Sequence, residues 1–435
     1  MKLLLVGGGG REHALAWRIR HELPTGIVLA APGNPGIAAL ATCVPISASD
    51  VSALVSLATT ENVDAVIVGP EAPLAAGLAD ACLARGIAVF GPTAAAAQLE
   101  TSKAFAKAVM RDAGVPTARA SIHTTLKSAR AAAREFGAPV VIKASGLAAG
   151  KGVVVAMTLD EADAAIVSML EENLFGDAGA EVLVEEFMTG EELSLFVLTD
   201  GETAVPLPAA QDHKRVGEGD TGPNTGGMGA YCPADAGDSS YTWHDDELPR
   251  GIQHVLDLIV APTLRAMRER GTPFRGLLYC GVMLTPTGPR VVEFNCRFGD
   301  PETQAVLPAL ADDAPLLRVM LQIARGERID PVPLFAPAQS VVTTVLAAEG
   351  YPGTPRSEDA ITLPEVVDRT WLFHAGTTLR DGTLVTSGGR VLAATATGST
   401  LDDAQARSRA LAAAVQFAGA FHRRDIGWRA LHRGA

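Results

Sequence analysis

The sequence predicts an α/β protein in which a parallel-sheet domain is followed by a second α/β unit, a region of longer strands and a small α+β domain. In residues 1–120, short apolar runs alternate with helical patterns, which is typical of βαβ units and a parallel sheet. From Leu193 to Cys296 the predicted strands are longer and mixed with loops. Beyond Arg325, strand-like runs and one long helical pattern indicate a separate unit. The predicted domains are 1–120, 121–190, 191–326 and 327–435.

The N-terminal region contains four apolar runs that we predict to be buried strands. Each run is followed by a turn rich in glycine and proline, and helical patterns over Arg11–Arg20 and Pro73–Ala84 lie between them. Ligands of parallel sheets bind at the carboxyl ends of the strands, so we expect a binding site along these turns. The four strands are Lys2–Val6, Ile27–Ala30, Asp64–Val68 and Ile87–Phe90.

The rest of the chain follows two further patterns. The segment Gly217–Pro233 is too rich in glycine for a regular element, and we predict an ordered active-site loop or lid there. Near the C-terminus, the turns RDG and SGG indicate hairpins. The predicted helices are Thr101–Ala113, Leu126–Phe136, Leu159–Glu171 and Leu401–Phe417. The predicted strands are Val140–Lys143, Val153–Met157, Glu181–Glu186, Val341–Ala347, Trp371–Ala375 and Val391–Ala396.

Composition excludes several classes of protein. With 48% hydrophobic and 20% charged residues, the 435-residue chain is not disordered. A net charge of −13 argues against broad binding to nucleic acid. The five cysteines form no C-x-x-C pair, so we expect a reducing cytosol and neither a zinc site nor a disulfide framework. The apolar stretch Leu3–Val6 is too short for a signal peptide, and no run suits a membrane span. We therefore expect a cytoplasmic protein with no membrane partner.

A first glycine-rich turn, within Val6–Trp17, could bring a helix N-terminus close to a phosphate. The dinucleotide fingerprint fails here, because Glu12 stands where its last glycine is required. NAD is therefore disfavoured, and a phosphate site of another kind is favoured over a tight structural turn. Next to it, His13 is more simply explained as a packed or solvent-facing helix residue than as a catalyst.

A second glycine-rich loop, Ser145–Val153, follows Lys143 and contains Lys151. Two lysines beside one glycine loop favour phosphate binding over a loose hairpin turn, although the Walker A spacing is absent.

Two acid-containing segments suggest further roles. On the strand within Val291–Glu302, Glu293 and Asn295 share one face and offer hard oxygen ligands for magnesium, with a structural ion pair as the alternative. Arg297 continues that face and could neutralise an anion, whereas Cys296 points into the core. Glu192, after a turn glycine, could reach a ribose diol.

The charge run at Asp212–Arg215 would ordinarily be a solvated face. Because it precedes the glycine-rich segment, we expect a loop that grips a substrate.

Taken together, these motifs resemble the glycinamide ribonucleotide synthetase family of ATP-grasp ligases. A generic ATP-grasp enzyme would share only the parts around Lys143, EEF and EFN. The resemblance covers essentially the whole chain, in the order GGREHALAW, APGNPG, VGPEAPL, GPTAAAAQLETSKAF, KASGLAAGKGV, EEF, QDHKRV, DTGPNTGGMGAY, EFNCRFGDPETQ, FHAGT, GGRVL and RRDIGWRA.

The resemblance implies a pre-ATP-grasp parallel-sheet domain, an ATP-grasp core with a small lid subdomain and a C-terminal α+β domain. It implies the ligation of glycine to 5-phosphoribosylamine with ATP and Mg²⁺ or Mn²⁺ in purine biosynthesis, through glycyl phosphate, by a monomer acting on small molecules.

The resemblance also implies roles for individual residues. ATP would contact Lys103, Lys143, Ser145, Gly146, Gly150, Lys151, Gly152, Glu185, Glu186, Phe187 and Glu192. Phosphoribosylamine and glycine would contact Gly9, Gly10, Arg11, Glu71, Asp212, Lys214, Asn224, Gly226 and Gly227. The metal would be bound by Glu293 and Asn295, and the catalytic residues would be Arg297, Lys143 and Asp212.

Some alternatives remain open at this point. Some ATP-grasp enzymes carry an extra metal-binding acid on the strand before Glu293, and Tyr279–Val282 has none, so the number of metal ions is open. The nearest rival is another carboxylate-activating ATP-grasp enzyme that uses formate or a carbamoyl group. A nucleotide sensor or NAD-binding protein without ligase activity belongs to a different class.

Overall fold

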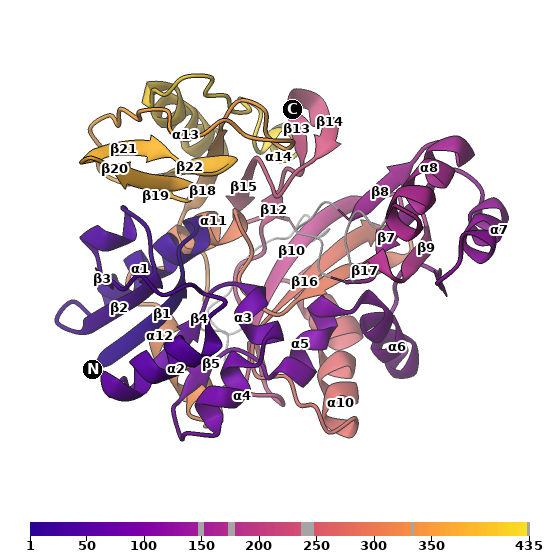
Figure 1. Cartoon of the computed structure of the whole chain (residues 1–435), viewed down its shortest axis with the longest axis horizontal. Coiled ribbons are helices and arrows are strands. Elements are labelled where there is room, and N and C mark those ends of the chain that lie inside the picture. Colours follow the sequence, from indigo (N-terminus) through magenta and orange to yellow (C-terminus); the bar gives the residue numbers. More distant parts are fainter. Residues whose placement is uncertain (147–151, 173–178, 236–247, 332–334, 433–435) are drawn as a thin grey trace.

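The N-terminal region is built on a five-stranded parallel sheet with strand order β3-β2-β1-β4-β5 (Figure 1). The structure, a computed structural model of the chain, describes residues 1–146, 152–172, 179–235, 248–331 and 335–432. The four predicted strands are confirmed, and a short fifth strand adds to the sheet edge. The strands are β1 (Lys2–Gly7), β2 (Ile27–Pro32), β3 (Thr42–Cys43), β4 (Ala65–Val68) and β5 (Val89–Phe90).

Two helices predicted in this part of the chain begin or break at different residues. The pattern over Pro73–Ala84 forms two helices, because Gly77 adopts a left-handed conformation with φ of 85° between them. The predicted helix from Thr101 begins at Lys103, where Ser102 caps a new helix. The helical elements are α1 (Gly10–Glu22), η1 (Ile37–Ala39), α2 (Val51–Thr60), α3 (Glu71–Ala75), α4 (Leu78–Leu83), α5 (Ala94–Thr101) and α6 (Lys103–Ala113).

The central region contains two separate four-stranded antiparallel sheets. The first, ordered β6-β9-β7-β8, packs against α7 and α8 around its own small hydrophobic core. The second is ordered β11-β10-β16-β17. The first unit comprises β6 (Ala120–His123), α7 (Leu126–Phe136), β7 (Val140–Ala144), β8 (Val153–Ala156), α8 (Leu159–Leu170) and β9 (Val182–Glu186). The second sheet comprises β10 (Glu191–Thr199), β11 (Ala204–Pro206), β16 (Gly276–Thr285) and β17 (Gly288–Asn295).

Helices of the central region flank the second sheet. A π-helical segment joins α9 to α10, and α11 and α12 follow β17. These elements are α9 (Arg250–Val255), η4 (Leu256–Val260), α10 (Ala261–Glu269), α11 (Glu302–Ala309) and α12 (Leu316–Ala324).

The C-terminal sheet takes two of its five strands from the central region, with order β12-β15-β18-β22-β19. The prediction that Gly217–Pro233 holds no regular element is therefore wrong: the segment contains β14 and β15, and β15 pairs with β18. The strands are β12 (Gln211–Asp212), β13 (Arg215–Gly217), β14 (Thr221–Asn224), β15 (Gly229–Cys232), β18 (Ser340–Ala347), β19 (Thr370–His374) and β22 (Arg390–Gly398). A short helical turn, η3 (Glu218–Asp220), joins β13 to β14.

Of the two hairpins predicted near the C-terminus, one is confirmed. β20 (Thr377–Arg380) pairs with β21 (Thr383–Thr386) across the RDG turn. The SGG turn instead leads from β21 into a different sheet, so it forms no hairpin. The helices here are α13 (Leu401–Ala414) and α14 (Trp428–His432). Among the helices that the structure describes, none combines the length and apolar character needed to cross a bilayer.

Candidate active site

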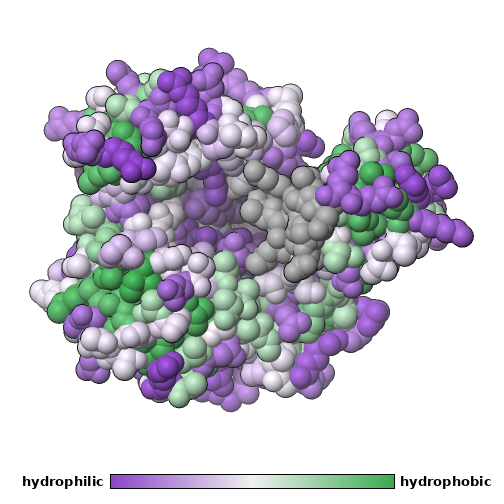
Figure 2. Space-filling model, viewed as in Figure 1, coloured by the Kyte–Doolittle hydropathy of each residue, from purple (hydrophilic) through white to green (hydrophobic). Residues whose placement is uncertain are grey.

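A cavity of about 440 Å³ lies where the two central sheets meet the N-terminal and C-terminal units. Figure 2 shows a hydrophilic hollow in the middle of the face on view. One part of the wall is apolar and comes from α6 and both sheets. That part includes Ala106, Met110, Val153, Val155, Met283 and Phe294. Charged side chains line the rest, so the cavity suits a ligand with one flat apolar part and several charges.

Three lysines gather at one end of the cavity, which we call the lysine end (Lys103, Lys107 and Lys143). The Lys143 Nζ lies 2.7 Å from one oxygen of Glu185, and the Lys107 Nζ lies 3.1 Å from the other. In contrast, the Lys103 Nζ donates to the carbonyl of Gly146 at 3.1 Å. Burial lowers the pKa of Lys103, although Glu293 works against this. An anionic ligand at this end would therefore meet cations that are incompletely neutralised.

Glu185 is a buried carboxylate between two of these lysines. Burial favours a raised pKa, but the ammonium groups of Lys143 and Lys107 hold the pKa of Glu185 below its ordinary value. Its carboxylate therefore fixes two lysines. The neighbouring Glu186 carboxylate accepts from the Arg119 backbone at 2.9 Å, and Phe187 is exposed. All three predicted residues line the cavity.

Glu293 and Asn295 face the cavity from β17. Opposite them, β16 places Gly281 beside Glu293 and Tyr279 beside Asn295, so the adjacent strand adds no carboxylate there. Burial acts to raise the pKa of Glu293, but Lys214, Lys143 and other nearby cations hold it low.

No cluster of three acidic, histidine or cysteine ligands exists among the residues that the structure describes. One carboxylate and one amide oxygen still fit Mg²⁺, which keeps several waters and shares its remaining positions with substrate phosphates.

Asp212 and Lys214 reach the cavity from β12 and the residues that follow it. The Lys214 Nζ forms an ion pair with Glu192. Burial opposes the charge on Lys214, but Asp212 and Glu192 outweigh this and raise the pKa of Lys214 well above its ordinary value. Burial also raises the pKa of Asp212 to about 7, against the effect of Lys214.

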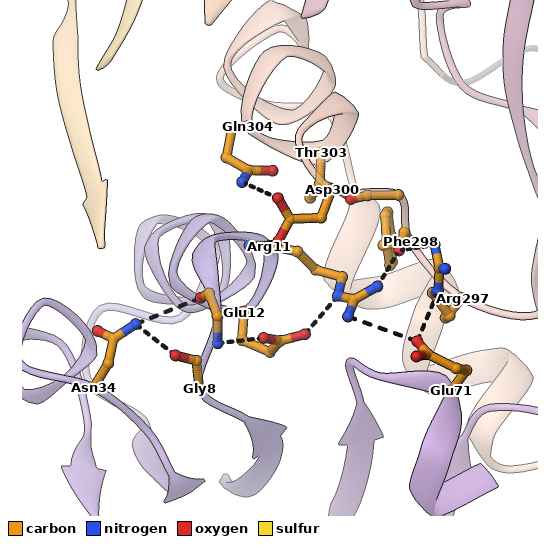
Figure 3. Close-up of polar contacts among 12 residues, drawn as sticks. Gly8, Arg11, Glu12, Asn34, Glu71, Arg297, Phe298, Asp300, Thr303 and Gln304 are labelled. Atoms are coloured by element: carbon orange, nitrogen blue, oxygen red, sulfur yellow. Dashed lines mark hydrogen bonds and ion pairs between the residues drawn. The ribbon is translucent and has the colours of Figure 1, made fainter. Parts of the chain in front are cut away.

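Two arginines and two glutamates line another part of the cavity, which we call the arginine end (Arg11, Glu71, Glu100 and Arg297). Figure 3 shows Arg11, Glu71 and Arg297. The Arg297 guanidinium lies 3.1 Å from Glu71 and 2.8 Å from Glu100. Arg11 lies 2.6 Å from Glu12 and 3.9 Å from Glu71. Burial favours a raised pKa for Glu71, but Arg297 and Arg11 hold it below its ordinary value. Glu71 thus stays an ionised hydrogen-bond acceptor.

The glycine turn before α1 is closely packed, and one of its amides is bound by a side chain of the helix. The Gly9 amide donates to the Glu12 carboxylate at 2.5 Å. A Cβ on Gly8 would lie 2.4 Å from the Gly33 carbonyl, and one on Gly10 would lie 2.5 Å from Gln304. These close contacts require glycine where the turn and the start of α1 approach the residue after β2 and the helix α11.

His13 is packed, as its helical position suggested. Its Nδ1 accepts the His374 backbone N–H at 2.8 Å, and burial lowers the pKa of His13 to about 3. Asn34 donates to the carbonyls of Gly8 at 2.9 Å and His374 at 2.8 Å. These contacts join the segments around Gly8, Asn34 and His374, which lie far apart in the sequence.

The structure brings most of the predicted site residues together. Those lining the cavity are Arg11, Glu71, Lys103, Lys143, Gly152, Glu185, Glu186, Phe187, Glu192, Asp212, Lys214, Asn224, Gly226, Glu293, Asn295 and Arg297. The lining does not include Gly9, Gly10, Ser145, Gly146 and Gly227. Gly150 and Lys151 lie outside the described residues.

Ser145 and Gly227 do not line the cavity, but they hold the segments around it in place. The Ser145 carbonyl accepts from the Lys103 amide at 2.9 Å and so holds the start of α6. Gly227 has φ of 108°, and a Cβ there would lie 2.4 Å from Pro301.

Sequence reasoning missed several cavity residues. Glu100, Asp300, Glu302 and Arg390 lie inside the motifs of the resemblance but carried no assigned role. Lys107 lies four residues after Lys103 on α6, and this helical spacing could have revealed it.

Comparison with known proteins agrees with this architecture. The chain matches the Phosphoribosylglycinamide synthetase N domain over residues 1–100, the ATP-grasp (A) domain over 101–303 and the C domain over 341–429. A biotin carboxylase domain of Hydrogenobacter thermophilus 2-oxoglutarate carboxylase superposes with a TM-score of 0.71 at 18% identity, covering 97% of this chain and 91% of that one. This second likeness shows the fold alone.

Closer relatives extend along the whole chain. A phosphoribosylamine–glycine ligase of Brucella melitensis is 48% identical over 436 residues, covering 100% of this chain and 99% of its own. The crystal structure of the Thermotoga maritima phosphoribosylamine–glycine ligase has a TM-score of 0.83 at 33% identity, covering 98% of this chain and 100% of that one. The chain therefore belongs to the phosphoribosylglycinamide synthetase family of ATP-grasp ligases.

Proposed function

We propose that this chain joins glycine to 5-phosphoribosylamine with ATP, giving glycinamide ribonucleotide, ADP and phosphate in purine biosynthesis. The observation that carries the proposal is one cavity in which the lysine end, Glu293–Asn295 and the arginine end meet. Family membership supports the substrates, because relatives matching nearly their whole length bear the name of this ligase.

ATP would occupy the apolar wall and the lysine end. The base suits the apolar residues of α6 and the two sheets, and Glu192 could accept from ribose hydroxyls. Lys103 and Lys143 would contact the phosphates. A divalent cation, Mg²⁺ or Mn²⁺, would be held by Glu293 and Asn295 and would supply charge neutralisation to the phosphates. The solved Hydrogenobacter protein, which has the same fold, was crystallised with MgADP, and this supports a nucleotide and a divalent cation in general terms.

Glycine and phosphoribosylamine would lie between Asp212 and the arginine end. A carboxylate is a poor electrophile, so the glycine carboxylate would first accept the γ-phosphoryl group of ATP. The amine then attacks the acyl carbon of glycyl phosphate, the C–N bond forms, and the C–O bond to phosphate breaks. Lys143 and Arg297 would balance the charge of the transferring phosphoryl group. Arg11, Glu71, Lys214 and Asn224 would orient the amine substrate.

Oxygen labelling tests this reaction path. Glycine labelled with ¹⁸O in its carboxylate should deliver one label to inorganic phosphate per turnover, with ADP formed in equal amount. A label in AMP, or unlabelled phosphate, would overturn the acyl phosphate path. ADP release that occurs with formate or a carbamoyl donor and not with glycine would instead establish a different member of the superfamily.

A further inference from the structure

The last motif of the sequence, RRDIGWRA at Arg423–Ala430, has no part in the cavity lining. It packs against the hairpin formed by β13 and β14, and Figure 1 shows α14 beside both strands. The side chain of Arg423 is only 1% exposed, although no ligand-binding role is evident for it. A buried guanidinium at this position calls for a physical explanation.

Arg423 contacts the hairpin directly through Nη1 and indirectly through Asp425. Its Nη1 donates to the Asp220 carboxylate at 2.9 Å and to the Arg215 carbonyl at 3.0 Å. Its Nε and Nη2 each donate to Asp425 at 2.8 Å. Asp425 in turn accepts the Gly219 amide at 2.8 Å. The guanidinium and its carboxylate partner thus hold both the backbone and a side chain of the turn.

The turn needs this support because two adjacent residues are left-handed. Gly219 has φ of 63° and Asp220 has φ of 57°, and a non-glycine residue in that region is unfavourable. Arg429 forms a second ion pair with Asp220, and the Gly427 amide donates to His213 Nε2 at 3.1 Å. These contacts fix the hairpin tip and the residue just before Lys214.

The base of the same hairpin reaches the cavity. The Thr225 amide and hydroxyl both donate to the Lys214 carbonyl, at 2.7 and 2.8 Å. Arg215 pairs with Asn224 across the two strands. A shift of the tip is therefore transmitted to Lys214 and Asn224, which line the cavity. A displacement of about 1 Å at such groups can cost about 100-fold in rate.

We propose that Arg423 is a positioning residue that, with Asp425, fixes the β13–β14 hairpin and thereby aims Lys214 and Asn224 at the amine substrate. The identity of that substrate rests on the proposed function. Arg423 acts on the amine end of the reaction, and the contacts of Lys103, Lys107 and Lys143 at the lysine end do not involve the hairpin.

Adjacent arginines provide a matched pair of variants for the test. Arg423→Gln removes the buried contacts, whereas Arg424→Gln changes an arginine that is 71% exposed and pairs with Glu218 on the same hairpin. Asp220→Asn is the second variant, because asparagine keeps the shape and tolerates the left-handed backbone. Each purified full-length protein is assayed for ADP release while phosphoribosylamine, glycine and ATP are varied in turn.

For Arg423→Gln we expect kcat/KM for the amine to fall about 10-fold or more, with KM for ATP changed less than about 2-fold. Asp220→Asn should shift the same constants in the same direction, and Arg424→Gln should match wild type. The Arg423→Gln, Asp220→Asn double variant should lose less than the sum of the two single losses, because both changes break the Arg423–Asp220 contact and only Asp220→Asn also weakens the pair with Arg429. Amide exchange at residues 213–225 should accelerate in Arg423→Gln.

Two results would overturn the proposal. One is a wild-type kcat/KM for the amine in Arg423→Gln and Asp220→Asn, and the other is an equal loss for ATP and amine. If Arg423→Gln shows no cooperative thermal unfolding, the kinetic constants of Asp220→Asn alone are used to distinguish these two results from the expected one. If the wild-type protein released no ADP with glycine and phosphoribosylamine, the proposed function would be refuted. The positioning role of Arg423 would still be tested by comparing nucleotide binding and amide exchange at residues 213–225 between wild type and the variants.

Discussion

The lysine end and the arginine end of the cavity both contain cationic side chains, but these are neutralised by carboxylates to different extents. At the arginine end, Arg297 lies within 3.1 Å of two carboxylates and Arg11 pairs with Glu12. At the lysine end, the Lys103 Nζ donates to the backbone carbonyl of Gly146 at 3.1 Å and forms no ion pair with a carboxylate among the described residues. This difference indicates that the lysine end is suited to bind an anionic ligand. The arginine end instead presents an oriented carboxylate, Glu71, to hydroxyl or amino groups.

The largest effect is expected at Glu293, between the two ends. Glu293→Gln keeps the shape but removes the charge, so turnover should fall about 100-fold or more while the melting temperature stays near wild type. Steady-state assays across a range of magnesium concentration measure this, with the exposed Glu202→Gln as control. Near-normal turnover at low magnesium would contradict the metal assignment.

At the lysine end, Lys103→Gln should weaken ATP selectively. Loss of one charge-assisted hydrogen bond, about 2 kcal/mol, corresponds to about a 30-fold rise in KM for ATP. The KM for phosphoribosylamine should change little. Lys127→Gln, on the exposed surface of α7, is the control. An equal rise in both constants would remove the distinction between the two ends.

At the arginine end, Glu71→Ala should show the opposite selectivity. Losing a hydrogen bond worth about 1.4 kcal/mol should raise KM for phosphoribosylamine about 10-fold, with a smaller change for ATP. Glu61→Ala, which removes a surface ion pair with Lys2, serves as control. Equal effects on both substrates would indicate a fold defect instead.

The last effect is on stability rather than on activity, and it concerns the packing of His13 on α1. His13 is neutral in the folded chain, with a pKa of about 3 against 6.5 when unfolded. The unfolded state therefore binds the additional proton, and stability is lost as pH falls from about 6.5 toward 3. Between pH 6 and 4.5, wild type should lose about 1.4 kcal/mol per pH unit more than His13→Gln. Urea unfolding at three pH values measures this slope, and parallel slopes would contradict the buried neutral state.

Sequence reasoning predicted the N-terminal sheet because its strands are continuous apolar runs with glycine-rich turns. It predicted the lysines and the Glu293–Asn295 pair because a local spacing places them on one loop or one strand face. It could not predict that Arg297 contacts Glu71, since these residues are 226 positions apart and only the tertiary fold joins them. It also missed β15, whose small residues resemble a loop until β18 lies beside them.

The glycine-rich segments Val6–Trp17 and Gly217–Pro233 illustrate the same limit of prediction from sequence. Glycine content indicates that something approaches the backbone closely, but the sequence does not identify what approaches. At Gly8 the neighbour is the Gly33 carbonyl, and at Gly227 it is Pro301. Whether a glycine serves a ligand or a packing contact is decided by residues elsewhere in the chain.

The pairing of β15 with β18 has a consequence for how the protein is made. Tyr231 pairs with Val342, which the ribosome adds 111 positions later. At roughly 5–20 residues per second, β15 spends on the order of ten seconds without the neighbour that fills one of its edges. An unpaired strand edge is a site for mispairing with other chains. Synthesis of this chain therefore includes an interval in which a chaperone that covers the unpaired edge would improve the yield of folded protein.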